Sequence, residues 1–191
     1  MKRSLLALFA IAAVISSCTP DPYKDNPVCK AIVQAAMAQY GNIEYDFSFT
    51  SLEVLDSTLL GTEFDRRIET FESRIKANSS LYEKYVKERK KKNAQIKADL
   101  VQHDKKVLAD LIALKGENTA RLGETAYYDY KFTALIKAGD KKLEMTDCYA
   151  AVTPDCEVLT LATDKKDLHK ATGKVIPGYY ETIRTSEPEE Q

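Results

Sequence analysis

The apolar residues of this chain alternate between helical and strand spacing along its length. Residues 27–41 carry a wide apolar face that includes Ile32 and Ala36, which lie about one helical turn apart. Pro27 suits the first turn of a helix, and Gly41 suits the position just after its end. This segment therefore predicts a helix that packs against other elements through one broad face.

A strand is predicted directly after this helix. In the segment 43–50, aromatic and aliphatic residues that include Phe47 and Phe49 alternate with polar ones, which is typical of a half-buried strand. The alternation then changes phase, because the next apolar residue, Leu52, has the opposite parity. We expect a bulge or bend near Ser51 to join the two halves.

The middle of the chain has the apolar spacing of long helices. Between Phe64 and Ile75, apolar residues recur at helical intervals. The Asn-Ser-Ser sequence at 78–80 is expected to interrupt this helix, because a capping-box pattern begins at Ser80. A second helix would then run over 80–115.

The predicted helix 80–115 is long for a small domain. It would extend about 54 Å if straight, so we expect it either to project beyond the sheet or to break near the polar stretch 87–95. His103 occupies a gap in its apolar stripe, where helical spacing calls for an apolar residue. The stripe itself consists of Ile96, Leu100, Val107, Leu111 and Leu114.

Strand patterns dominate the last third of the chain. Residues 126–138 alternate regularly, and the turn sequence at 138–142 leads into a second pattern at 143–152. A third pattern at 156–163 follows the turn at 153–155. We therefore expect three successive strands that form an antiparallel meander.

The order of the predicted elements indicates an α+β fold rather than an alternating α/β fold. Helices would pack on a curved antiparallel sheet that contains the C-terminal meander, and a long helix could project from it. A short helix is expected at 164–170 and an edge segment at 175–180. The element order is loosely similar to cystatin-like and nuclear-transport-factor-like folds. The expected organisation is a signal peptide at 1–17, a lipidated tether at 18–26, one α+β domain at 27–185 and a disordered acidic tail at 186–191.

The first eighteen residues have the pattern of a secretory signal. A basic start precedes the apolar stretch Leu5–Ile15, which is about half the length needed to span a bilayer. Two serines then lead to Cys18, and this Ile-Ser-Ser-Cys sequence resembles the lipobox of bacterial lipoproteins. The resemblance implies cleavage before Cys18 and attachment of lipid to its thiol and amino group. The mature chain would then be bound to a membrane through its lipid anchor.

The residues after Cys18 indicate which membrane the lipid-anchored chain would reach. Thr19 stands where an aspartate would resemble an inner-membrane retention signal, so the sequence favours the outer membrane. Asp21 and Asp25 resemble the acidic export signals of Bacteroidetes surface lipoproteins. The sequence leaves open whether the protein faces the periplasm or the outside of the cell.

The net charge of the chain limits the kinds of partner that it is expected to bind. The chain of 191 residues has 28 basic and 29 acidic residues, a net charge of −1. Because there is no basic excess, nucleic acid is not an expected partner. A protein of the cell envelope is the expected partner besides the membrane.

Three cysteines remain after Cys18, and an oxidising compartment favours pairing two of them. Cys148 and Cys156 flank the turn at 153–155 and form the favoured disulfide candidate. The rival pairing joins Cys29 to one of these two. No metal site is expected, because the sequence has no closely spaced cysteine pair and only two histidines.

Catalytic signatures are not found in the sequence. It has no glycine-rich phosphate loop, no nucleophile elbow and no HExxH motif, and we predict neither catalytic residues nor a cofactor. A hydrolase that uses carboxylates stays open, because such residues leave no short motif. The expected function is therefore noncatalytic.

Two hypotheses follow for that function. The chain could be an interaction or accessory module that presents its long helices, or it could bind a small molecule, glycan or lipid in a sheet concavity. A deep pocket lined by residues such as Phe132 would favour the second. Lysines at 90–92 could contact anionic groups, or they could form part of a solvated helix. Tyrosines at 127, 128 and 130 could bind sugar or protein, or they could cover the sheet. The candidate binding residues are Lys90, Lys91, Lys92, Tyr127, Tyr128 and Tyr130.

Overall fold

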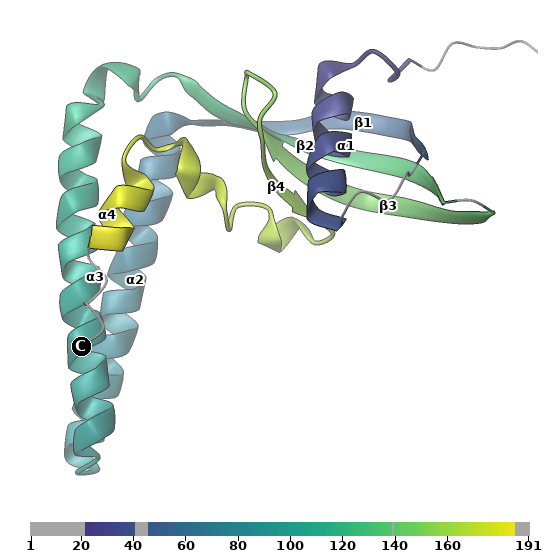
Figure 1. The fold of residues 1–191 in the computed structure, drawn as a ribbon. Helices are drawn as coiled ribbons and strands as arrows, with labels where there is room; N and C mark the ends of the chain where they lie inside the picture. Colours follow the sequence, from purple (N-terminus) through teal and green to yellow (C-terminus); the bar gives the residue numbers. More distant parts are fainter. Residues whose placement is uncertain (1–21, 41–45, 139, 186–191) are drawn as a thin grey trace, which may run out of the picture.

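The computed structural model describes residues 22–40, 46–138 and 140–185. It is an α+β structure, as predicted, in which a curved sheet carries one helix on its face and a long helical hairpin at its end (Figure 1). The described helices are α1 (Pro27–Tyr40), α2 (Leu60–Lys87), α3 (Lys91–Glu117) and α4 (Tyr179–Thr185), with short 3-10 turns at Thr119–Arg121, Lys165–Asp167 and Thr172–Val175. The described strands are β1 (Asp46–Leu59), β2 (Thr125–Ala138), β3 (Lys141–Val152) and β4 (Val158–Ala162).

The described strands form one antiparallel sheet in the order β1-β2-β3-β4. The predicted meander of β2, β3 and β4 is confirmed, and β1 pairs with the outer edge of β2. The register of β1 shifts between Phe49 and Ser51, where the change of parity predicted a bulge. The predicted start of this strand at 43–45 lies outside the described residues.

Helix α1 crosses one face of the sheet (Figure 1). It begins where the sequence predicts, because the side chain of Asn26 accepts hydrogen bonds from the backbone N–H groups of Val28 and Cys29 at 2.9 and 3.2 Å. Ile32 and Cys29 are almost fully buried against strand residues that include Phe132. This contact forms the principal core of the sheet half of the molecule.

The two long helices α2 and α3 form an antiparallel hairpin. The predicted interruption at 78–80 is wrong, since α2 continues without a break to Lys87. The reason is that Asn78 does not cap a helix but accepts a hydrogen bond across the hairpin from Lys97 Nζ at 3.0 Å. The second prediction, a break near 87–95, is confirmed at residues 88–90.

This break is a Schellman turn with an arginine in its left-handed position. Arg89 has a φ of 56°, and its N–H bonds to the carbonyl of Val86 at 3.1 Å. The next residue, Lys90, donates its N–H to the carbonyl of Tyr85 at 2.9 Å. The two bonds satisfy carbonyls at the end of α2 and reverse the chain into α3.

The hairpin seam is apolar near the sheet and contains a buried acid further out. Val107 and Leu111 are fully buried next to Phe71 of α2. Asp104 is also fully buried, and Arg74 forms an ion pair with it at 2.8 Å. The seam therefore places Asp104, not its neighbour His103, at the inward position that the sequence pattern left polar.

The C-terminal segment folds back onto the hairpin. Helix α4 places Tyr179 and Ile183 against the cluster formed by Phe71, Val107 and Leu111. The predicted edge segment at 175–180 is therefore wrong. Gly178, with a φ of 78°, lets the chain turn into α4 instead of extending along the sheet. The short helix predicted at 164–170 is present only as the 3-10 turn Lys165–Asp167.

A buried polar cluster joins the hairpin to the sheet. Glu63 at the base of α2 is fully buried and contacts Arg67 Nε at 2.7 Å, Arg66 Nη1 at 2.5 Å and the hydroxyl of Tyr127 at 2.8 Å. Thr172 donates its hydroxyl to the same carboxylate at 2.9 Å. Because Tyr127 belongs to β2 and Thr172 to the turn before α4, the cluster ties the base of α2 to both the sheet and the C-terminal segment.

Candidate functional site

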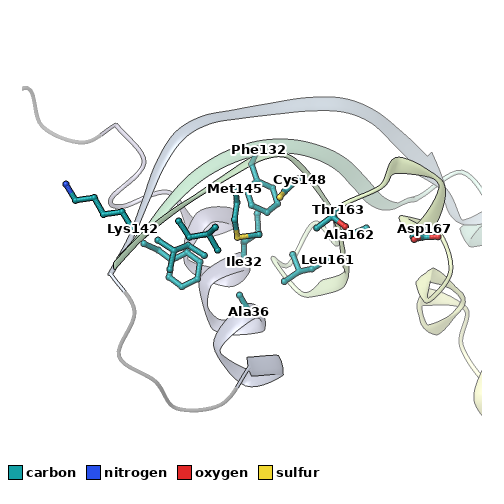
Figure 2. Close-up of a pocket in the computed structure, with 13 residues that line it drawn as sticks. Ile32, Ala36, Phe132, Lys142, Met145, Cys148, Leu161, Ala162, Thr163 and Asp167 are labelled. Atoms are coloured by element: carbon teal, nitrogen blue, oxygen red, sulfur yellow. The ribbon is translucent and has the colours of Figure 1, made fainter. Parts of the chain in front are cut away.

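One feature that could hold a ligand is a cleft between α1 and the concave face of the sheet, with a volume of about 990 Å³ (Figure 2). Ile32 and Ala36 form its α1 wall, and Phe132 and Cys148 belong to the strands that arch over it. This volume is at the upper end of the range typical of small-molecule sites. We refer to it as the α1–sheet cleft.

The lining of the α1–sheet cleft is mostly apolar. Its polar side chains are at the ends, where Figure 2 places Lys142 on one side and Thr163 and Asp167 on the other. Asp167 already forms an ion pair with Lys170 at 2.6 Å, whereas Lys142 is an exposed ammonium group at the mouth. The complete lining is Ile32, Ala36, Phe47, Phe132, Ile136, Lys142, Leu143, Met145, Cys148, Leu161, Ala162, Thr163 and Asp167.

A bulge in β3 brings its apolar residues to the same face. Asp147 has a left-handed φ of 54°, and the register of β3 on β2 shifts between the Phe132 and Ala134 pairs. The extra residue lets Cys148 point to the same side as Met145, although their parity differs. Leu143, 61% exposed, continues this apolar row to the mouth of the cleft.

The three predicted tyrosines do not form a common binding surface. Tyr127 is fully buried in the cluster around Glu63, so its assignment to an exposed surface is wrong. It is buried because the segment after β4 covers that face of β2, and this burial raises the pKa of Tyr127. Tyr128 and Tyr130 are half-buried with ring centroids 6.4 Å apart, and neither lines the α1–sheet cleft.

The predicted lysines are brought together, but far from the cleft. Lys90, Lys91 and Lys92 are all exposed at the turn between α2 and α3, at the end of the arm remote from the sheet. Lys90 forms an ion pair with Glu88 at 2.7 Å. These residues therefore belong to a separate surface.

The predicted disulfide is not formed. Cys148 and Cys156 are both free thiols, which also excludes the rival bonds of either residue with Cys29. Cys148 lies within β3 on the cleft side, whereas Cys156 lies in the turn between β3 and β4. The register pairs Tyr149 of β3 with Ala162 of β4, so Cys156 does not lie across from Cys148 at the Cα separation of roughly 5.5 Å that a disulfide needs. The predicted lipidation site, Cys18, lies outside the described residues.

Sequence reasoning missed one polar pair at the other face of the sheet. His169 Nε2 lies 2.8 Å from Asp129 Oδ2, and Asp129 is buried in β2. The two residues are 40 positions apart, so no local pattern could have found them. The neighbouring Tyr127 ring fills the space beside the imidazole, with ring centroids 5.8 Å apart. In the described part of the chain, no group of three His, Cys, Asp or Glu side chains is placed to hold a metal ion.

Comparison with known proteins does not place this fold in a family. No protein-family model, curated protein or solved structure matches the chain. None of the helices in the described segments has both the length and the apolarity required to cross a membrane.

Proposed function

We propose that this chain is a noncatalytic, lipid-anchored protein of the cell envelope that binds an apolar, chain-like molecule in the α1–sheet cleft. The observation that supports this function is the cleft itself, which has a volume of about 990 Å³ and a mostly apolar wall. The lipobox-like sequence ending at Cys18 supports an envelope location, with the outer membrane as the proposed destination.

The chemistry of the lining favours a fatty-acyl chain over a sugar. A glycan needs several hydrogen-bonding side chains along its length, whereas the polar groups of this cleft stand only at its ends. An acyl chain needs apolar contact along its length and one polar contact at its head. Lys142 at the mouth would pair with a carboxylate at that head.

The expected affinity follows from the burial of methylene groups. A chain that buries about fifteen methylenes gains ~12 kcal/mol from their removal from water. Association costs at least ~4 kcal/mol in lost freedom of motion. The remaining ~8 kcal/mol corresponds to a Kd of about 1 μM.

The test measures the binding of cis-parinaric acid, a fluorescent fatty acid, to the purified chain without its signal peptide and with Cys18→Ser. Leu143→Glu and Ile136→Glu each place a charge at the cleft wall and should weaken binding at least about tenfold. Val54→Glu is the matched control, because Val54 is 55% exposed and lies outside the cleft. Lys142→Gln should weaken binding of the acid but not of its methyl ester.

Two outcomes would contradict the proposal. One is a wild-type chain that binds neither the acid nor the ester. The other is equal affinity in the Leu143→Glu variant and the Val54→Glu control, because Leu143 is exposed enough to accept a charge without unfolding. Thermal melts of each variant separate lost binding from lost structure.

Docking of an envelope protein through the helical stripe is the second candidate. The stripe is not one surface, however, since Val107 and Leu111 are fully buried while Ile96 is 48% exposed. Replacing the buried members would unfold the arm rather than expose a docking defect. The observation that favours this function is therefore limited to the exposed apolar residues of the distal arm.

A further inference from the structure

The distal end of the hairpin is strongly basic. We define the arm tip as residues 81–97, which contain seven lysines or arginines and two glutamates and therefore carry a net charge of +5. The whole chain carries −1, so the remaining residues together carry −6. This separation of charge places one positive surface at the end of a projecting element (Figure 1).

The arm holds this tip well away from the rest of the molecule. Helix α2 has 28 residues, which correspond to about 42 Å of helix. Helix α4 packs on the half of the hairpin nearer the sheet (Figure 1), where Tyr179 and Ile183 lie against the cluster of Phe71, Val107 and Leu111. Within the described residues, the outer half of the hairpin is thus a two-helix structure that presents its tip to solvent.

Exposed apolar side chains accompany the basic turn. Val86 is 51% exposed one residue before the end of α2, and Tyr82, one helical turn earlier, is 41% exposed. Ile96 is 48% exposed at the start of α3. A soluble polyanion would contact the basic side chains alone and would leave these apolar side chains in water. An anionic bilayer contacts basic side chains at its headgroups and apolar side chains just beneath them.

From this combination we propose that the arm tip binds the surface of a bilayer that contains anionic phospholipid. Lys91 and Lys92, both exposed at the first turn of α3, contact the lipid phosphates together with Arg89. Val86 inserts among the headgroups. The interaction does not depend on the cleft or on the lipid anchor, because the tip is formed by residues of the hairpin alone.

The experiment is co-sedimentation with vesicles, using the chain without its signal peptide and with Cys18→Ser, so that no covalent lipid contributes. Vesicles of phosphatidylcholine containing about one third phosphatidylglycerol should bind the protein at roughly millimolar lipid, and phosphatidylcholine alone should not. Molar salt should release it. The triple variant Lys90→Gln, Lys91→Gln, Lys92→Gln should bind about a hundredfold more weakly, a loss of about fivefold for each charge.

The matched control removes three exposed charges elsewhere, through Lys76→Gln, Lys105→Gln and Lys165→Gln. It should bind within about twofold of the wild type, since charges beyond a Debye length are screened. Equal binding of the two triple variants, or no binding of the wild type to anionic vesicles, would overturn the proposal. Val86→Gln should weaken binding about fivefold. Unchanged binding in that variant would overturn the choice of a bilayer in favour of a polyanion or an acidic protein.

Discussion

Replacing Glu63 with alanine should loosen the joint between the arm and the sheet. This carboxylate is fully buried and is the shared partner of Arg67, Tyr127 and Thr172. Arg67 is itself only 8% exposed, so it cannot turn into water when the carboxylate is removed. Its guanidinium would keep the carbonyl of His169, at 2.7 Å, but would lose the only negative charge that these contacts give it.

The expected loss of stability in Glu63→Ala follows from the buried charge of Arg67 that is left without a partner of opposite charge. Breaking a buried ion pair by removal of one partner costs about 3–5 kcal/mol. For a domain of this size, each kcal/mol lowers the Tm by about 2–4 °C, so the Glu63→Ala variant should melt roughly 6–20 °C below the wild type. Urea denaturation followed by circular dichroism measures the free energy directly. Glu69→Ala on the same helix is the control, because Glu69 is exposed and its loss should cost less than about 0.5 kcal/mol.

A double variant decides whether charge is the cause. Glu63→Leu combined with Arg67→Leu removes both buried charges and should recover at least about half of the lost free energy, since apolar groups often replace a buried ion pair at little cost. A loss of less than about 1 kcal/mol in Glu63→Ala would refute the reasoning. So would a double variant as unstable as Glu63→Ala alone, because the missing packing would then outweigh the charge.

Two further predictions concern backbone strain and thiol chemistry. Arg89→Gly should raise the free energy of unfolding, measured by urea titration, by about 0.5–1 kcal/mol. The reason is that glycine adopts the left-handed φ of 56° without the steric penalty of a side chain. A lower free energy of unfolding in this variant would contradict that reason. Iodoacetamide at about pH 8 should alkylate Cys156 well before Cys148, because burial raises the pKa of the Cys148 thiol and leaves it only 3% exposed. Peptide mapping by mass spectrometry would report the alkylation rates of the two cysteines. Equal rates would show that the reagent reaches Cys148 in the cleft wall.

The sequence predicts most elements because their signals are local. The parity change at Leu52 located the β1 bulge, and the regular alternation at 126–138 predicted β2. The helix boundaries were harder to predict from the sequence. Ser80 has the composition of a cap, yet it lies inside α2, where the contact of Asn78 with α3 outweighs local preference. The actual break has an arginine where glycine is expected, so the sequence located it only to the polar stretch 87–95.

The α1–sheet cleft could be predicted only in part. The apolar face of α1, with Ile32 and Ala36, was visible as a helical stripe, but the distance between that stripe and β3 depends on tertiary packing. Strand alternation alone left the face of Cys148 open, because the left-handed Asp147 shifts the parity of β3. The 61% exposure of Leu143 at the mouth of the cleft likewise follows from tertiary packing and not from the strand pattern at 143–152.

The two proposed surfaces share a chain but not a physical mechanism, and the fold explains why they can be tested apart. The α1–sheet cleft depends on apolar contact between a helix and a sheet, whereas the arm tip depends on charge at the end of a hairpin about 42 Å long. Charges that far apart are screened in physiological salt. The joint around Glu63 lies between them, so a Leu143→Glu variant that altered vesicle binding would mean that this joint transmits a change from the cleft to the arm. If each variant affects only its own ligand, the arm is a rigid spacer that sets the distance between a bound chain and a membrane surface.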